Sequence, residues 1–182
     1  YVNYAQLLIK LGQLDRALAQ FDTALRIHPG AVRAWVLRGV ALARAGRVPE
    51  AVAHYEEALR LDPTAPQAHY NLGVALLGQG KIQEAEESLI KAIGCSPGLA
   101  EAYVQMGGIC MKRGDMDACL DWNQRAVKVK PGFSEGWGNI GFVHLQMGQI
   151  DEAIKALKRA THFNFRFIQA FTTLANAYLM KG

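Results

Sequence analysis

The chain has 182 residues, 51% of them hydrophobic, and carries a formal net charge of +4 with a pI near 9.0. This apolar content is sufficient for a continuous core, yet no apolar run approaches the ~18 residues that a membrane-spanning helix needs. No leader segment is apparent, so the cytoplasm is the default location, and the odd number of cysteines, three, does not suit a disulfide framework.

Glycines, prolines and alanines recur at a fixed step of 34 residues along the chain. They are Gly12, Gly46, Gly80, Gly114, Gly148 and Gly182, then Pro29, Pro63, Pro97 and Pro131, and Ala24, Ala58, Ala92, Ala126 and Ala160. A fixed period of about this length is the signature of stacked helix–turn–helix units that contact only their neighbours. We therefore expect a single array over residues 1–182, with units at about 1–31 (truncated), 32–65, 66–99, 100–133, 134–167 and 168–182 (partial).

Each period contains a first helix and a second helix. Between residues 29 and 63, the apolar spacing predicts a first helix from about Arg33 to Ala45 and a second helix from about Val48 to Leu61. Gly46 is placed to end the first helix, and Pro63 cannot continue the second.

Small residues recur at one position in the middle of the first helices. Because a mid-helix glycine costs ~1 kcal/mol relative to alanine, this column predicts close contact between helices. Large residues of the same helices are expected to fill the opposing hollows, and the cysteines, which fall in packing columns, are expected to be small buried hydrophobes. The small residues are Ala5, Gly39, Gly73, Gly107, Gly141 and Ala175, the large ones Trp35, Tyr103, Trp137 and Phe171, and the cysteines Cys95, Cys110 and Cys119.

Two positions depart from the repeat. Phe165 stands where a proline is expected, and we expect its aromatic surroundings to replace the proline turn by packing. Asn123 stands where other units have a large apolar residue, so we expect the fourth unit to pack with a local shift. The last helix, from Phe171 to Met180, presents an apolar face without a partner, which predicts that the array continues in a parent protein or that neighbouring molecules cover this end.

One spacing of residues resembles the tetratricopeptide repeat motif. It is Trp35-x-x-x-Gly39-x-x-Leu42, followed by Gly46, Ala51, Tyr55, Ala58 and Pro63. The resemblance extends over the whole chain and implies an all-α fold, a right-handed superhelical solenoid of antiparallel helix pairs, with about five repeats and a partial one. It also implies that the first helices line a concave groove, a kind of surface that binds extended partners.

One column expected to face the groove is rich in side-chain amides, which offer both a hydrogen-bond donor and an acceptor. A row of amides can bind a peptide backbone of any sequence, and this row resembles the asparagine ladder of the tetratricopeptide superhelix in O-linked N-acetylglucosamine transferase. Solvation of an exposed helix face is the alternative interpretation. The column is Asn3, Leu37, Asn71, Gln105, Asn139 and Thr173, in which Leu37 and Thr173 interrupt the amides.

Aromatic, basic and glycine residues are expected on the same groove. The aromatic residues could act as anchors for a partner, and the arginines are expected to reach the groove surface. The glycines interrupt first helices without belonging to the packing column, which close approach of a ligand backbone would explain, as would a local bend. These residues are Tyr70 and Phe142, Arg33 and Arg44, and Gly78, Gly108 and Gly138.

No constellation for catalysis is apparent, and the five histidines are scattered without metal-ligand spacing. We therefore predict no enzyme activity, no metal and no cofactor within these residues. The predicted function is a protein-interaction scaffold that binds an extended or amphipathic peptide of a protein partner in its groove. The alternatives are an RNA-binding superhelix and an array that self-associates end to end, although a nucleic-acid partner is disfavoured because the sequence has no continuous basic stripe.

Overall fold

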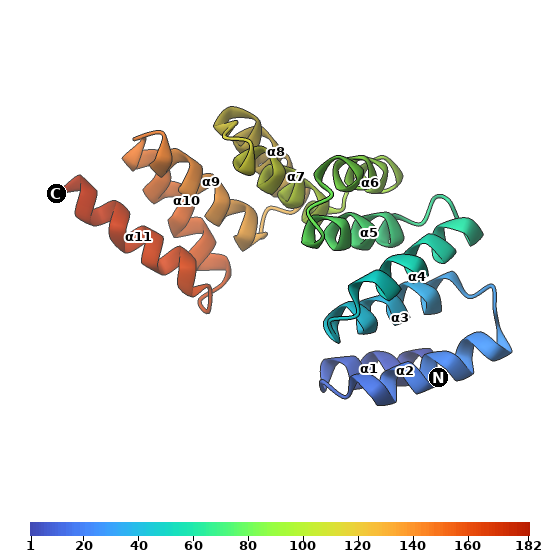
Figure 1. Cartoon of the computed structure of the whole chain (residues 1–182). Coiled ribbons are helices and arrows are strands. Elements are labelled where there is room, and N and C mark those ends of the chain that lie inside the picture. The colour runs from blue at the N-terminus through green and yellow to red at the C-terminus, as the bar shows by residue number, and fades with distance from the viewer. The chain divides into compact units, whose positions relative to one another are not determined.

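The computed structural model describes residues 1–182 and consists of eleven α-helices without a strand (Figure 1). The all-α fold predicted from the period is therefore confirmed. The helices are α1 (Val2–Lys10), α2 (Leu14–Ile27), α3 (Val32–Arg44), α4 (Val48–Leu61), α5 (Pro66–Gly78), α6 (Ile82–Cys95), α7 (Ala100–Lys112), α8 (Met116–Val129), α9 (Ser134–Gln146), α10 (Ile150–Phe163) and α11 (Ile168–Lys181). No helix combines the length and the apolar character that a membrane span requires.

The chain forms two compact units, the N-terminal unit Tyr1–Ser96 and the C-terminal unit Pro97–Gly182. In the N-terminal unit, α1 packs on α2, α3 on α4 and α5 on α6. In the C-terminal unit, α7 packs on α8 and α9 on α10, while α11 contacts both α9 and α10. Both units are thus stacks of helix pairs, and their continuity as one array stays a prediction.

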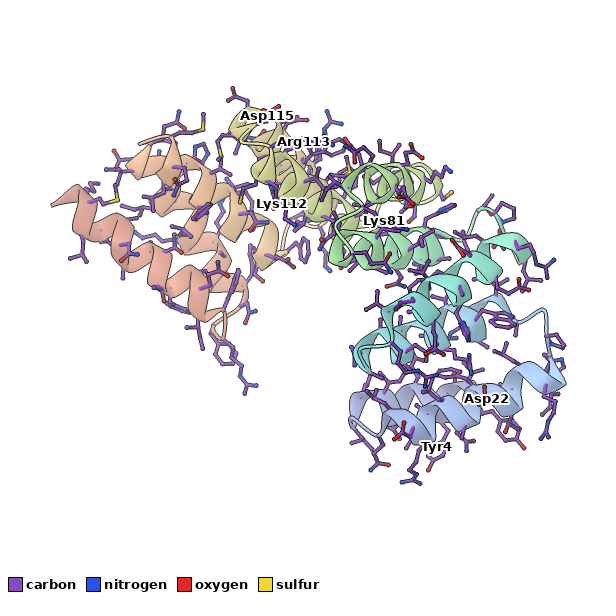
Figure 2. All side chains as sticks on the ribbon, viewed as in Figure 1. Tyr4, Asp22, Lys81, Lys112, Arg113 and Asp115 are labelled. Atoms are coloured by element: carbon purple, nitrogen blue, oxygen red, sulfur yellow. The ribbon has the colours of Figure 1, made fainter.

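A glycine with a left-handed backbone ends the first helix of each pair. Gly80 has a φ of +78°, and the Lys81 N–H that follows it donates to the Leu76 carbonyl at 3.0 Å, which closes the end of α5. The equivalent glycines at 12, 46, 114 and 148 have φ between +72° and +79°. The next helix then begins within three residues, and at α8 the carboxylate of Asp115, labelled in Figure 2, caps it by accepting from the Ala118 N–H at 2.9 Å.

The small-residue column packs directly on the second helix of the same pair. A Cβ added at Gly73 would lie 2.8 Å from Leu89 Cγ, and one added at Gly141 would lie 2.5 Å from Leu157 Cγ. The predicted close contact is therefore confirmed, because even a methyl group has no room at these positions.

The large residues at the starts of the first helices do more than fill hollows. Each donor in this column reaches the carbonyl of the proline six residues earlier and so ties a first helix to the loop before it. The bonds are Trp35 Nε1 to Pro29 O at 2.7 Å, His69 Nε2 to Pro63 O at 2.9 Å, Tyr103 Oη to Pro97 O at 3.1 Å and Trp137 Nε1 to Pro131 O at 2.8 Å. Where Phe165 replaces the proline, the column residue is Phe171, which has no donor.

One packing expectation was confirmed in part and another was wrong. Of the aromatic residues around the missing proline, Phe167 packs against the core of α10 and α11, whereas Phe165 itself is 76% exposed. Cys95 is exposed at the end of α6, whereas Cys110 and Cys119 are buried as expected.

Candidate functional site

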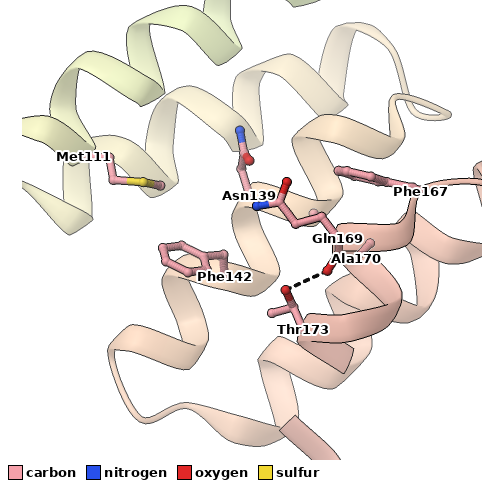
Figure 3. Close-up of a pocket in the computed structure, with 8 residues that line it drawn as sticks. Met111, Asn139, Phe142, Phe167, Gln169, Ala170 and Thr173 are labelled. Carbon is pink, nitrogen blue, oxygen red and sulfur yellow. Dashed lines mark hydrogen bonds between the residues drawn. The ribbon is translucent and has the colours of Figure 1, made fainter. Parts of the chain in front are cut away.

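The C-terminal unit contains a pocket between successive first helices (Figure 3). It has a volume of about 130 Å³ and is lined from α7, from α9, from α11 and from the residue just before α11. Three of the residues predicted for the groove, Asn139, Phe142 and Thr173, meet here. The lining is Met111, Gly138, Asn139, Phe142, Phe167, Gln169, Ala170 and Thr173.

The Asn139 amide is held in place by a second asparagine. Its Nδ2 donates to Asn123 Oδ1 at 3.0 Å, and Asn123 Nδ2 in turn donates to the Cys119 carbonyl at 2.8 Å. Asn123 is fully buried, so both its amide atoms need such partners. The consequence for the pocket is that this bond orients the Asn139 carbonyl oxygen and uses one of the two N–H donors of the amide.

Thr173 and Phe142 supply different surfaces to the pocket. The Thr173 hydroxyl donates to the Gln169 backbone carbonyl at 2.8 Å, as the dashed line in Figure 3 marks, so towards a ligand it can only accept. Phe142 is half-buried and forms an apolar wall. Gln169, beside them on α11, is exposed and adds amide donors to this mixed surface.

Gly138 has a packing role, which corrects the expectation that it serves no packing contact. It is buried, and a Cβ added there would lie 2.8 Å from the Phe167 ring. Gly78 and Gly108 differ, because an added Cβ would meet nothing within 4 Å at either position.

The N-terminal unit has a comparable pocket between α3 and α5. It has a volume of about 310 Å³ and brings together Arg44, Asn71 and Gly78 with the apolar residues Val40 and Val74. No hydrogen bond within the protein occupies the Asn71 amide, in contrast to that of Asn139. This pocket therefore offers a free amide beside a cation.

Tyr55 forms part of the floor of the same pocket. Its ring packs against Gly39 and only 2% of the residue is exposed. Burial raises the pKa of Tyr55 to about 12, so the hydroxyl keeps its proton and remains a possible donor at neutral pH.

A third pocket, of about 470 Å³, lies at the other end of α3 in the N-terminal unit. Arg33 and Leu37 line it together with Gln6 and Asp62, and Arg33 donates to Gln6 Oε1 at 3.0 Å. Hydrogen bonds from the Thr64 side chain and backbone lower the pKa of Asp62, so a carboxylate faces this part of the surface.

The remaining predicted residues lie apart from these pockets. Asn3 is exposed on α1 and lines a separate hollow near the start of the chain. Tyr70 on α5, and Gln105 and Gly108 on α7, are half-buried. The amide column is therefore present on the first helices, but its members do not share one pocket.

Gln67 and Gln169 belong to the pockets but were missed in the sequence. Both fall in the 34-residue column of Arg33, as do Glu101 and Glu135, so every member of that column is polar. Because Arg33 was already predicted to reach the groove, the residues at 34-residue steps from it could have been predicted to do so as well.

Two carboxylates limit the positive charge at the starts of α7 and α9. Burial raises the pKa of Glu101, but the hydrogen bond that Lys130 donates at 2.8 Å, a backbone hydrogen bond and the Lys130 charge together outweigh burial, so the pKa is lowered overall. Burial and then the charge of Glu101 raise the pKa of Glu135. No group of three or more His, Cys, Asp or Glu residues in the chain could hold a metal ion.

Comparisons with known proteins agree with this architecture. Three tetratricopeptide repeat models match residues 4–66, 42–94 and 134–164. The chain belongs to the tetratricopeptide repeat family. Proteins of this family are interaction scaffolds and are typically non-catalytic, so this tetratricopeptide chain has the fold of a scaffold for protein or peptide partners. Its sequence matches no curated protein.

Solved tetratricopeptide structures resemble the whole chain. MamA is 25% identical with a TM-score of 0.74, and the match covers 91% of this chain and 97% of MamA. YrrB, described as a tetratricopeptide protein with an unusual peptide-binding site, is 26% identical with a TM-score of 0.67 over 94% of this chain and 89% of its own. TTC0263 of Thermus thermophilus, at 22% identity, a TM-score of 0.78 and coverage of 98% and 97%, shows likeness of fold.

Proposed function

We propose that the chain binds an extended peptide segment of a partner protein on the surfaces between its successive first helices. The observation that carries this proposal is the pocket of the C-terminal unit, where the oriented Asn139 carbonyl, the Gln169 amide and the Phe142 ring meet. An amide acceptor beside amide donors matches a peptide backbone, and an aromatic wall matches a side chain of that peptide.

The pocket of the N-terminal unit supports the same function. Asn71 lies beside Val40 and Val74, so a polar group with no internal partner stands on an apolar surface. This combination is typical of small ligand sites, in which a few polar groups orient what apolar contacts bind. YrrB, with its peptide-binding site, supports peptide binding as a use of this architecture.

RNA is the less favoured ligand for these surfaces. A groove that follows a phosphate backbone needs a continuous basic stripe. Glu101, Glu135 and Asp62 place carboxylates along the first helices and their adjoining loops, which would repel phosphate.

The proposal is tested by selecting peptides from a displayed random library on the immobilised protein and measuring their affinity for variants. Asn71→Ala, Phe142→Ala and Gln169→Ala are suited to this test because their side chains have no hydrogen-bond partner inside the protein. We expect at least one of these substitutions to lower the affinity for a selected peptide roughly tenfold, as loss of an anchor residue does. Gln124→Ala, an exposed amide on α8, is the matched control. Peptides that bind all three variants as tightly as the control would exclude these surfaces.

A further inference from the structure

The C-terminal unit has another pocket, on a different side of α9 from the residues described above. It lies between α9 and α10 and has a volume of about 470 Å³. None of its lining residues is shared with the pocket that contains Asn139. The lining is Pro131, Trp137, Lys158, Arg159, His162 and Phe163.

The walls of this pocket are aromatic and apolar. The only polar atom of the Trp137 indole, Nε1, already donates to the Pro131 carbonyl at 2.8 Å. The Phe163 ring lies beside Gly132, where an added Cβ would be 3.7 Å from it, and 48% of the Phe163 surface is exposed. An incoming group therefore meets two aromatic surfaces that need no hydrogen bond from it.

Two cations border these walls and have no carboxylate partner. The Arg159 guanidinium lies 4.4 Å from the centre of the Trp137 ring, and Lys158 Nζ lies 5.6 Å from the centre of the Tyr178 ring. One turn earlier on α10, Lys155 is paired with Glu152 at 3.1 Å. The unpaired positive charge of α10 is thus concentrated at the pocket.

The fold itself does not require these cations. Three periods earlier, at the equivalent positions beside Pro29 and Trp35, the chain has Glu56 and Glu57. There the Trp35 ring packs edge-on against His54, 5.2 Å away, whereas the counterpart of His54 beside Trp137 is Ala156. The aromatic residue is repeated while both charges are reversed. A cation recurs in the column of Arg159, at Lys91 and Arg125, but Lys158 is the only cation in its own column, which points to a ligand rather than to folding as the reason for Lys158.

We propose that this pocket binds an acidic segment of a partner protein. Its carboxylates pair with Lys158 and Arg159, and an aromatic or aliphatic side chain between them enters the space bordered by Trp137 and Phe163. Charge complementarity selects the acidic segment. The pocket favours a protein over a nucleic acid. One face of Trp137 is already covered by Arg159, so a base cannot stack there, and Lys155, one turn before the pocket, is paired with Glu152.

A displayed library of random dodecapeptides, selected on the wild-type protein and depleted on the Lys158→Glu/Arg159→Glu variant, tests this site. We expect the retained peptides to combine aspartate or glutamate with an aromatic or aliphatic residue. The tightest of them, synthesised with a fluorophore, should bind Lys158→Glu roughly tenfold more weakly than the wild type, and its affinity should fall as salt is added.

The matched control is Lys155→Glu, which makes the same charge change on the same helix outside the pocket. It should bind the peptide within about twofold of the wild type, since exposed charges outside the contact contribute little. The Phe142→Ala variant separates this site from the proposed groove, because it should leave the acidic peptide bound. Circular dichroism melting of each variant checks that the helices remain folded.

Several results would overturn the proposal. One is a selection from which no peptide survives depletion, or whose peptides have no excess of acidic residues. Another is equal weakening by Lys158→Glu and Lys155→Glu, which would indicate a general charge effect. Binding of labelled oligouridine or of vesicles containing phosphatidylserine, lost in Lys158→Glu while no acidic peptide binds, would assign the pocket to RNA or to a membrane surface instead.

Discussion

Asn139 on α9 donates from its side-chain nitrogen to the buried Asn123 oxygen of α8, 3.0 Å away. This bond joins a residue of the candidate peptide surface to the interior of the preceding helix pair. It explains why the fourth unit tolerates an asparagine where others have Phe21, Tyr55 or Leu89, because the buried amide finds partners at both ends. Because of this bond, a mutation of Asn139 is expected to change the stability of the fold as well as the candidate peptide surface.

Removing Asn139 should cost more stability than removing Asn123. In Asn139→Ala the Asn123 oxygen is left buried without a partner, which is expected to lower the free energy of unfolding by about 1–3 kcal/mol. In Asn123→Leu the buried amide disappears altogether, and leucine occupies the equivalent place against glycine in neighbouring pairs. We expect its free energy of unfolding in urea to lie within about 1 kcal/mol of the wild type or above it. A larger loss in Asn123→Leu than in Asn139→Ala would contradict this account.

Two adjacent glycines of α7 should respond oppositely to alanine. A Cβ at Gly107 would collide with the Asn123 amide, whereas a Cβ at Gly108 would meet nothing within 4 Å. Gly107→Ala is expected to destabilise the protein by about 1–3 kcal/mol through overpacking. Gly108→Ala should stabilise it by up to ~1 kcal/mol, because alanine favours a helix interior. Thermal unfolding followed by circular dichroism compares the two, and a gain of stability in Gly107→Ala would show that Asn123 moves aside freely.

The period and its breakers allowed the helices to be placed from sequence. The predicted second helix from Val48 to Leu61 coincides with α4, and the predicted first helix differs from α3 by one residue at each end. Glycine at positive φ and proline act within a few residues of themselves, so their effect can be interpreted without knowledge of the tertiary structure.

The contacts that shape the pockets could not be predicted in the same way. Asn123 and Asn139 lie in different columns, so whether their amides meet depends on how α8 packs on α9. Among the clustered phenylalanines, Phe167 packs and Phe165 is exposed. Comparison of equivalent positions in successive repeats could have separated the two phenylalanines. Phe165 replaces a loop proline, whereas the position of Phe167 is also phenylalanine one period earlier, at residue 133. The placement of Arg159 over Trp137 likewise depends on a long, flexible side chain.

The hydrogen bond between a first helix and the preceding proline can be tested by deleting a single oxygen atom. Tyr103→Phe deletes the hydroxyl that donates to the Pro97 carbonyl at 3.1 Å and leaves the ring in place. We expect the free energy of unfolding to fall by about 0.5–1.5 kcal/mol, the usual net contribution of such a bond. Tyr178→Phe is the matched control because Tyr178 is 45% exposed on α11, and it should change stability by less than half as much. Equal effects of the two variants would show that the bond to Pro97 contributes nothing.

Acid should weaken the N-terminal unit partly through His54. Burial, and then the positive charge of Arg38, lowers the pKa of His54 below its ordinary value of 6.5, and its Nε2 is buried without a hydrogen-bond partner. The unfolded chain therefore takes up this proton at a higher pH than the folded chain does. The stabilisation from neutral His54 is complete above about pH 6.5 and is lost as the pH falls from there through the folded-state pKa.

Urea unfolding at pH 7.5 and pH 5.0 measures this contribution of His54. The wild type should lose more stability between the two pH values than His54→Gln, in which this titration is absent. His28→Gln is the control, because His28 is exposed and should leave the wild-type loss unchanged. If His54→Gln lost as much stability on acidification as the wild type, the buried imidazole would have to be protonated in the folded protein without cost, which its unpaired Nε2 and the nearby Arg38 both oppose.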